Sequence, residues 1–135
     1  MERRDGPIVV VGSVNLDLVC RTPRIPQGGE TILGSDFVTI PGGKGANQAC
    51  AAGRLSPDSL GVRMIGRVGY DVFADHLKAS LSAAGVDVQA VHATRSQPTG
   101  VALIWVDRRG QNSIVVASGA NMELRAADVE EPAHA

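Results

Sequence analysis

The 135-residue chain is poor in aromatic side chains, carries almost no net charge and has only a short apolar run near its start. Aromatic residues make up 3% of the chain, too few for a surface that stacks on nucleic-acid bases. With 13 basic and 14 acidic residues, it lacks the charge excess that attracts nucleic acid or an anionic membrane. Apolar residues 8–11 fall far short of a signal-peptide core or a membrane span. We therefore expect a soluble cytoplasmic protein with no nucleic-acid or membrane partner.

Cysteine and histidine are also scarce, with two and three copies. Cys20 and Cys50 lack both metal-ligand spacing and a nearby histidine, so both are expected to be ordinary small apolar residues. The histidines are scattered along the chain. We predict no metal site, and by its length the chain is one small domain.

Glycine, by contrast, is concentrated in residues 40–49, Ile-Pro-Gly-Gly-Lys-Gly-Ala-Asn-Gln-Ala, where a strand is expected to pass into a helix. Glycine lets the backbone turn sharply and lets a ligand approach the main chain. The first N–H groups of a helix that begins near Lys44 lack intrahelical partners and face whatever lies above the strand end. A glycine pair alone is more often a simple turn, but Lys44 and Asn47 follow on the first helical turn. The segment therefore predicts a binding site for a polar small molecule.

Two better-known glycine motifs do not fit this segment. A Walker A loop needs Ser or Thr after its lysine, whereas Lys44 is followed by Gly45. A dinucleotide fingerprint from Gly43 would need a small residue at Gln48 and an acidic residue at a strand end about 20 positions later. A nucleotide-binding Rossmann fragment thus stays as a minor alternative.

A second candidate segment follows the apolar run 8–11, which reads as a short parallel strand that is buried on both faces. After it, Ser13, Asn15 and Asp17 alternate with aliphatic residues, so an extended chain places all three on one face. Open α/β sheets bind ligands at the carboxyl ends of their strands, so Asn15 and Asp17 are candidates for the same cleft as the glycine-rich segment. An edge strand with one solvated face is the alternative.

The remaining pattern predicts a parallel α/β layer and a second, smaller sheet. Helices are expected at 44–55 and 71–84, the second with Val72, Phe73, Leu77 and Leu81 facing inward, and strands at 62–66 and 86–91. Residues 107–112 have the composition of a hairpin turn between strands 101–106 and 113–117. The half-polar segments 15–40 and 99–117 could come together as a separate sheet. Residues 118–121 are expected to turn back toward the core, and residues 125–131 to start a helix.

In this order, the segments closely resemble the amino-terminal part of the ribokinase (PfkB-type) family of carbohydrate kinases, from about residue 8 to residue 121. The resemblance is carried by Val11-Gly12-Ser13 with Asn15 and Asp17, by residues 26–31 with Gly-Glu-Thr, by the box 42–49, by Gly66-Arg67-Val68-Gly69 with Asp71, and by Thr99-Gly100-Val101-Ala102. The chain departs from the family pattern at Tyr70, where an acidic residue is usual, and at Ala74, where glycine is usual.

The resemblance implies an α/β fold: part of a ribokinase-like doubly wound parallel sheet with a small β-sheet lid. The α/β core would comprise residues 1–14, 41–93 and 118–135, and the lid strands residues 15–40 and 94–117. The implied sugar-binding residues are Asn15, Leu16, Asp17, Gly43, Lys44, Gly45, Ala46 and Asn47. Asn15 and Asp17 would hydrogen-bond sugar hydroxyls, and Lys44 could steady charge on the transferred phosphoryl group.

The resemblance also implies what to expect of cofactors and partners. Full-length members use ATP and Mg²⁺ with a monovalent cation, but their general base, anion hole and nucleotide pocket lie in a carboxyl half that nothing after Asn121 resembles. We therefore expect no catalytic residue, ATP site or metal in this chain. The chain would be a truncated gene product or a fragment of a longer kinase, and alone it would show no turnover.

The leading interpretation is the sugar-binding and lid portion of a kinase that converts ribose to ribose 5-phosphate, with ribose as ligand and a homodimer through the lid. A non-catalytic sugar-binding or dimerisation module, and a kinase for another sugar or a nucleoside, remain alternatives.

Overall fold

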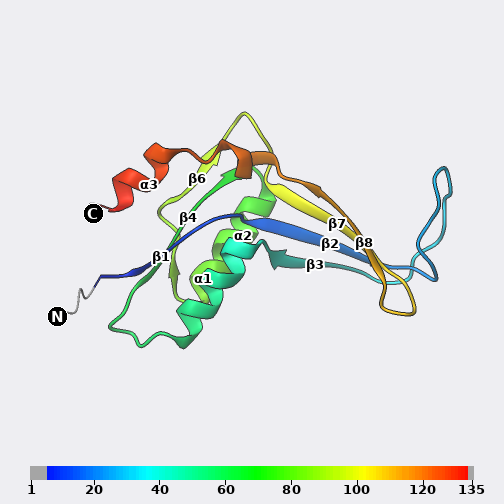
Figure 1. Ribbon diagram of the computed structural model, residues 1–135, viewed down its shortest axis with the longest axis horizontal. Coiled ribbons are helices and arrows are strands. Elements are labelled where there is room, and N and C mark those ends of the chain that lie inside the picture. Colours follow the sequence, from blue (N-terminus) through cyan, green and yellow to red (C-terminus); the bar gives the residue numbers. More distant parts are fainter. Residues whose placement is uncertain (1–5, 134–135) are drawn as a thin grey trace.

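The computed structural model describes residues 6–133 and contains two separate sheets (Figure 1). The first sheet is parallel and is built around β4 (Val62–Gly69). Strand β1 (Ile8–Val11) pairs with β4 on one side, and β5 (Val86–Asp87) and β6 (Val91–Thr94) pair with it on the other. This is the predicted parallel layer, although the strand expected at 86–91 is divided into two short ones. The division falls at residues 88–90, where the amide of Val91 donates to the carbonyl of Val88 at 3.0 Å.

The second sheet, which we call the lid sheet, contains β2 (Asn15–Arg21), β3 (Phe37–Gly42), β7 (Gly100–Val106) and β8 (Asn112–Ala117). Its order is β3-β2-β7-β8, with β2 and β7 parallel and both outer pairs antiparallel. Figure 1 shows it extending away from the helices toward the right of the view. The prediction that the two half-polar segments form a separate small sheet is confirmed. Because β2 is paired on both sides, the alternative of an edge strand is wrong.

Helices α1 (Lys44–Leu55) and α2 (Val72–Ala83) pack against the parallel sheet, as predicted for both segments. The small residues of α1 let it lie close to its neighbours: a Cβ atom placed on Gly53 would be 2.2 Å from the carbonyl oxygen of Ala84. The main hydrophobic core lies between these helices and the sheet. Its largest fully buried side chains include Met64, Leu77, Leu81 and Val68.

The chain then returns to β4 through a 3-10 helix, η1 (Gly119–Glu123), and ends in α3 (Ala126–Ala133). The predicted return of residues 118–121 to the core is confirmed by Ala120, which is fully buried. Arg67 of β4 holds α3 through an ion pair with Asp128, whose Oδ2 accepts from Arg67 Nε at 3.0 Å.

Two burial predictions are wrong. Strand β1 was expected to be buried on both faces, yet Ile8, Val9 and Val11 are about 40% exposed, because within the described residues β1 has a strand on one side only. Val72 was expected to face inward, yet it is 75% exposed. It is the first residue of α2, directly after the N-cap Asp71, so its side chain lies beyond the part of the helix that covers the sheet.

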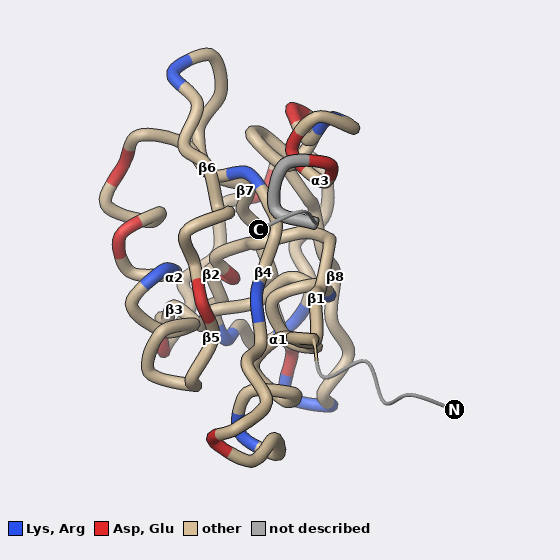
Figure 2. Tube along the Cα trace, turned by 90° about the vertical axis from the view of Figure 1, so that its left-hand side faces the viewer, with Lys and Arg blue, Asp and Glu red and all other residues tan. Residues whose placement is uncertain are grey.

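Charged residues of both signs are spread over the molecule. Lys and Arg residues are interspersed with Asp and Glu residues along the trace (Figure 2), in line with the formal net charge of -1. Within residues 6–133, no helix is both long and apolar enough to cross a membrane.

Candidate functional site

The glycine-rich segment lies where the end of β3 and the start of α1 meet the connection between β1 and β2. Gly43 adopts φ +94°, and a Cβ atom there would be 2.6 Å from the carbonyl oxygen of Ser13. A Cβ atom on Gly45 would be 2.8 Å from the backbone of Gly12. Both positions need glycine, one for its backbone conformation and one for close approach. The glycines thus set the start of α1 directly against the carboxyl end of β1.

Hydrogen bonds fix the first turn of α1 in this place. The amide of Ala46 donates to the carbonyl of Ser13 at 3.0 Å, and the amide of Asn47 donates to the carbonyl of Gly43 at 2.9 Å. The amides of Lys44 and Gly45, at the first two helical positions, have no intrahelical acceptor by the geometry of a helix. The side chains of Lys44 and Asn47 are exposed on the same turn. The start of α1 therefore offers donors of both kinds to a polar ligand.

Asn15 and Asp17 reach the same place from β2. In the sheet register Asn15 lies opposite Gly42 and Asp17 opposite Ile40, and residues two apart on a strand share a face. The carboxylate of Asp17 covers Gly42: a Cβ atom on that glycine would be 2.6 Å from Asp17 Oδ2. Burial raises the pKa of Asp17, and no hydrogen bond to its carboxylate occurs among residues 6–133. Asp17 is a half-buried acceptor that is open to a ligand.

Two other predicted site residues, Leu16 and Ala46, are buried in the hydrophobic core. Leu16 is 2% exposed and its side chain leaves the opposite face of β2, where it joins the hydrophobic core. Ala46 is 6% exposed, and its amide is already bonded to Ser13. The structure thus brings the segments that carry Asn15, Asp17, Gly43, Lys44 and Asn47 together where β2, the end of β3 and the start of α1 meet, with Gly45 as a packing contact.

Asn121 of η1 is hydrogen-bonded to residues of this site, although no sequence pattern predicted it as a site residue. Its Oδ1 accepts from the amide of Val14 at 2.9 Å. Its Nδ2, which has two protons to donate, lies within hydrogen-bond distance of three acceptors: the carbonyl oxygen of Val14 at 3.2 Å, that of Ser118 at 3.0 Å and Asn15 Oδ1 at 2.7 Å. The partners lie more than 100 positions apart in the sequence, except Ser118, so no local pattern could have revealed them.

A second polar network ties the parallel sheet to the base of the lid sheet. Asp71 caps α2 by accepting from the amide of Ala74 at 2.9 Å, and its other oxygen accepts from the amide of Thr99 at 2.9 Å. The hydroxyl of Thr99, which is buried, donates to Asp71 and accepts from the amide of Gly69 at 2.9 Å. Burial alone would raise the pKa of Asp71, but the hydrogen bonds from Thr99 and from the start of α2 outweigh it and lower the pKa. The network connects β4, α2 and the residue that precedes β7.

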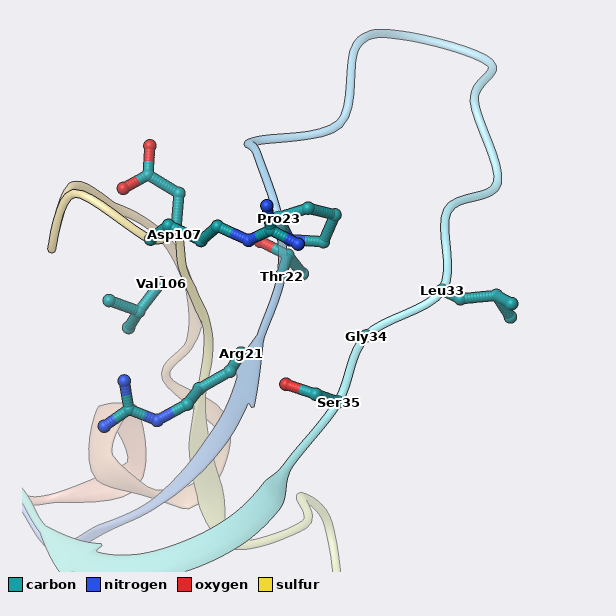
Figure 3. Close-up of a pocket in the computed structure, with 9 residues that line it drawn as sticks. Arg21, Thr22, Pro23, Leu33, Gly34, Ser35, Val106 and Asp107 are labelled. Carbon is teal, nitrogen blue, oxygen red and sulfur yellow. The ribbon is translucent and has the colours of Figure 1, made fainter.

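A cavity of about 240 Å³ lies at the far end of the lid sheet (Figure 3). Its walls come from the ends of β2 and β7 and from the loop before β3: Arg21, Thr22, Pro23, Leu33, Gly34, Ser35, Val106, Asp107 and Arg108. Leu33 points away from β2, whereas the hydroxyl of Ser35 points toward it. No predicted site residue lines this cavity. Within the described part of the chain, no group of three or more His, Cys, Asp or Glu side chains could hold a metal ion.

Comparison with known proteins places the fold. A ribokinase structure from Giardia lamblia superposes with a TM-score of 0.83 at 38% identity and covers 95% of this chain and 38% of its own. An Arabidopsis thaliana ribokinase structure, described as complexed with ribose and ATP, superposes with a TM-score of 0.77 at 37% identity, over 86% of this chain and 37% of its own. The ribokinase of Schizosaccharomyces pombe is 47% identical over 91% of this chain and 40% of its own length.

The fold is thus that of the ribokinase-like carbohydrate kinases. Residues 6–135 match the sequence model described as pfkB family carbohydrate kinase, and the chain belongs to that family. It spans about 40% of the length of the curated relatives that it matches.

Proposed function

We propose that this chain is the sugar-binding and lid portion of an ATP-dependent carbohydrate kinase that converts ribose to ribose 5-phosphate. The observation that carries the proposal is the meeting of Asn15 and Asp17 on one face of β2 with the glycine-rich start of α1. Ribokinases among the relatives and structural neighbours support ribose as the substrate. The general base and the nucleotide pocket would lie outside these 135 residues.

In this proposal each polar group of the site has a role that suits its chemistry. The Asp17 carboxylate accepts from sugar hydroxyls, which replace the water that burial removes from it. Asn15 and Asn47 bind further hydroxyls, and the amides at the start of α1 add donors. Lys44, at the first position of α1, brings a cation to the side where the phosphoryl group arrives. Leu16, Gly45 and Ala46 shape the pocket through their backbone and packing.

The finer expectations belong to the same proposal. ATP, Mg²⁺ and a monovalent cation would act in the longer protein without ligands from the residues described. The core would comprise residues 1–14, 41–93 and 118–135, and the lid 15–40 and 94–117, in a cytoplasmic protein. The half-exposed apolar side chains of the lid sheet, such as Val38, Ile40 and Ile114, fit a homodimer through the lid. A non-catalytic sugar-binding module and a kinase for another sugar or nucleoside are the alternatives.

Titration of the chain with ribose, followed by backbone amide NMR, tests the sugar site. We expect localised shifts at Asn15, Asp17, Gly43 and Asn47. Asp17→Ala and Asn47→Ala should each weaken binding by about tenfold to a hundredfold, since an unpaired buried polar group costs roughly 1 to 3 kcal/mol. Asp36→Ala, which removes an exposed carboxylate before β3, is the matched control. Unchanged affinity in both site variants would contradict the assignment.

A coupled ADP-release assay tests the position of the catalytic groups. We expect the 135-residue chain to show no ribose-dependent ADP release. Ribose-dependent turnover by the purified chain would show that it contains a base and a nucleotide site, and that their proposed location elsewhere is wrong. Ribose binding without turnover distinguishes a sugar-binding portion from a chain that has no sugar site.

A further inference from the structure

Asn15 accepts a hydrogen bond from Asn121 of η1, whose side-chain amide also contacts Val14 in the connection between β1 and β2. We propose that Asn121 is a positioning residue: it fixes the amide of Asn15 so that Asn15 offers N–H donors, and not its oxygen, to the sugar cleft. The inference rests on the proposed function because it concerns the same site. It adds that the ligand atom beside Asn15 must accept a hydrogen bond.

The orientation of both amides follows from their surroundings. The amide N–H of Val14 can only donate, so the atom of Asn121 that faces it at 2.9 Å must be the oxygen. The other end of Asn121 then carries the nitrogen, which faces the carbonyl oxygens of Val14 and Ser118, and these can only accept. The atom of Asn15 at 2.7 Å from this nitrogen must in turn be an acceptor, its Oδ1. The nitrogen of Asn15 is therefore the end left for a ligand.

Packing around the pair keeps this arrangement in place. A Cβ atom on Gly100, the residue opposite Asn15 in β7, would be 2.3 Å from both Asn121 Nδ2 and Asn15 Oδ1. Only glycine leaves room for the contact. The helix η1 is itself anchored, since the fully buried Ala120 donates its amide to the carbonyl of Pro98 at 2.8 Å. Asn121 thus acts on Asn15 from a fixed support.

The result is a site with one donor and one acceptor on the same face of β2. Asn15 requires a ligand atom that accepts a hydrogen bond, and Asp17 requires one that donates. Neutral hydroxyl groups do both, so neighbouring hydroxyls of a sugar satisfy the pair. A protonated amine cannot accept from the nitrogen of Asn15. The position beside that nitrogen therefore favours a neutral hydroxyl over an ammonium group.

Hydrogen exchange of the side-chain amides in the ligand-free chain tests the orientation directly. We expect the Nδ2 protons of Asn121 to exchange at least tenfold more slowly than those of Asn112, an exposed asparagine at the start of β8. The Nδ2 protons of Asn15 should exchange about as fast as those of Asn112 and become slower when ribose is added. Rapid exchange at Asn121 with slow exchange at Asn15 would overturn the proposal. This measurement needs no variant and no turnover.

A double-mutant cycle tests whether Asn121 acts through Asn15. Asn121→Asp removes the donor, turns the Asn15 amide round and should weaken ribose binding at least tenfold, whereas the same change at the exposed control, Asn112→Asp, should not. With Asn15→Ala in place, Asn121→Asp should cause no further loss. An equal loss in both backgrounds would show a merely structural role and overturn the proposal.

The two measurements also separate this inference from the proposed function. If the wild-type chain binds no ribose, the proposed function is contradicted, and the exchange rates still decide the orientation of Asn15. If Asn121→Asp does not fold, the exchange rates of the wild type decide it alone. If ribose binds and the exchange rates are reversed, the proposed function stands and this inference falls.

Discussion

The parallel sheet and the lid sheet are stabilised in different ways, although each has four strands. The parallel sheet carries the core of large side chains that are almost fully buried, Met64 and Leu77 among them. The lid sheet exposes its aliphatic residues: Val38, Ile114 and Val116 are about 50% exposed. The lid gains less from burial of its own apolar surface, so its place depends on its backbone ladder and on connections to the core.

Those connections are polar and lie at the base of the lid. Asn121 joins the start of β2 to η1, and the Asp71–Thr99 pair joins the start of β7 to β4 and α2. Partly buried hydrogen-bond networks of this kind favour one arrangement because a broken member leaves its partners unpaired. One of these strands, β2, also carries Asn15 and Asp17 of the candidate sugar site. The comparison indicates that the core sets the stability of the molecule while the polar anchors set the position of the lid.

The largest expected effect separates core from lid. Leu77→Ala should lower the free energy of unfolding by about 2 to 5 kcal/mol, because it leaves a cavity beneath α2 in the most buried part of the molecule. Ile114→Ala, in the half-exposed lid strand β8, should lower it by less than about 1 kcal/mol. Urea unfolding of both variants measures the difference. Equal losses would show that the lid has a core of its own.

A smaller effect is expected when the anchor of the lid is removed. Asp71→Ala deletes the cap of α2 and leaves the amide and hydroxyl of Thr99 unpaired, which should cost about 1 to 3 kcal/mol. Hydrogen exchange should become faster in β7 and β2 as well as in α2. Asp75→Ala, an exposed carboxylate on the same helix, is the control and should leave the lid unchanged. Faster exchange confined to α2 would show that Asp71 is a helix cap and no anchor.

The elements that could be predicted from the sequence are those with local signals. Helix α1 follows from small residues at helical spacing, and the β7–β8 hairpin follows from the turn composition of residues 107–112. The separate small sheet follows from half-polar strands that do not fit the parallel layer. The pairing of β2 with β7, by contrast, joins residues about 85 positions apart, and no local pattern encodes such a contact.

The candidate site was predictable to the same extent. The alternation of Asn15 and Asp17 and the glycine box indicate the residues that we propose as ligand-facing, and the structure brings these two segments together. Asn121 lies in a short turn whose composition predicts only a return of the chain. Its role depends on the atoms of Val14 and Asn15, which are placed beside it by the whole fold. The exposure of β1 likewise depends on which strands flank it, and its own apolar sequence does not reveal this.

A third prediction uses pH to test an ion pair on the core side, between Arg67 and Asp128. The hydrogen bonds and charge of Arg67 lower the pKa of Asp128 below its ordinary value of 3.8. A lowered folded-state pKa gives stability that is complete above 3.8 and is lost as the pH falls through the folded-state value. Asp128→Asn should therefore cost of order 1 kcal/mol at pH 7 and progressively less below pH 3.8. A difference between wild type and variant that stays constant down to pH 2 would contradict the role of the charge.

The smallest expected effect is a gain in stability, and it concerns Asp17 of the candidate site. Burial raises the pKa of Asp17, so the folded state holds its proton more tightly than the unfolded state. The stability that this provides is present below the unfolded-state pKa and is lost as the pH rises through the folded-state value. At neutral pH the ionised Asp17 therefore weakens the fold slightly. Asp17→Asn should raise the midpoint of thermal unfolding at pH 7 by a small amount while it weakens ribose binding, and Asp36→Asn, in the exposed loop before β3, should do neither. A loss of stability in Asp17→Asn would show that the carboxylate helps to hold the lid sheet in place. The proposed contrast between a stabilising core and a lid strand that serves ligand binding would then be wrong at this residue.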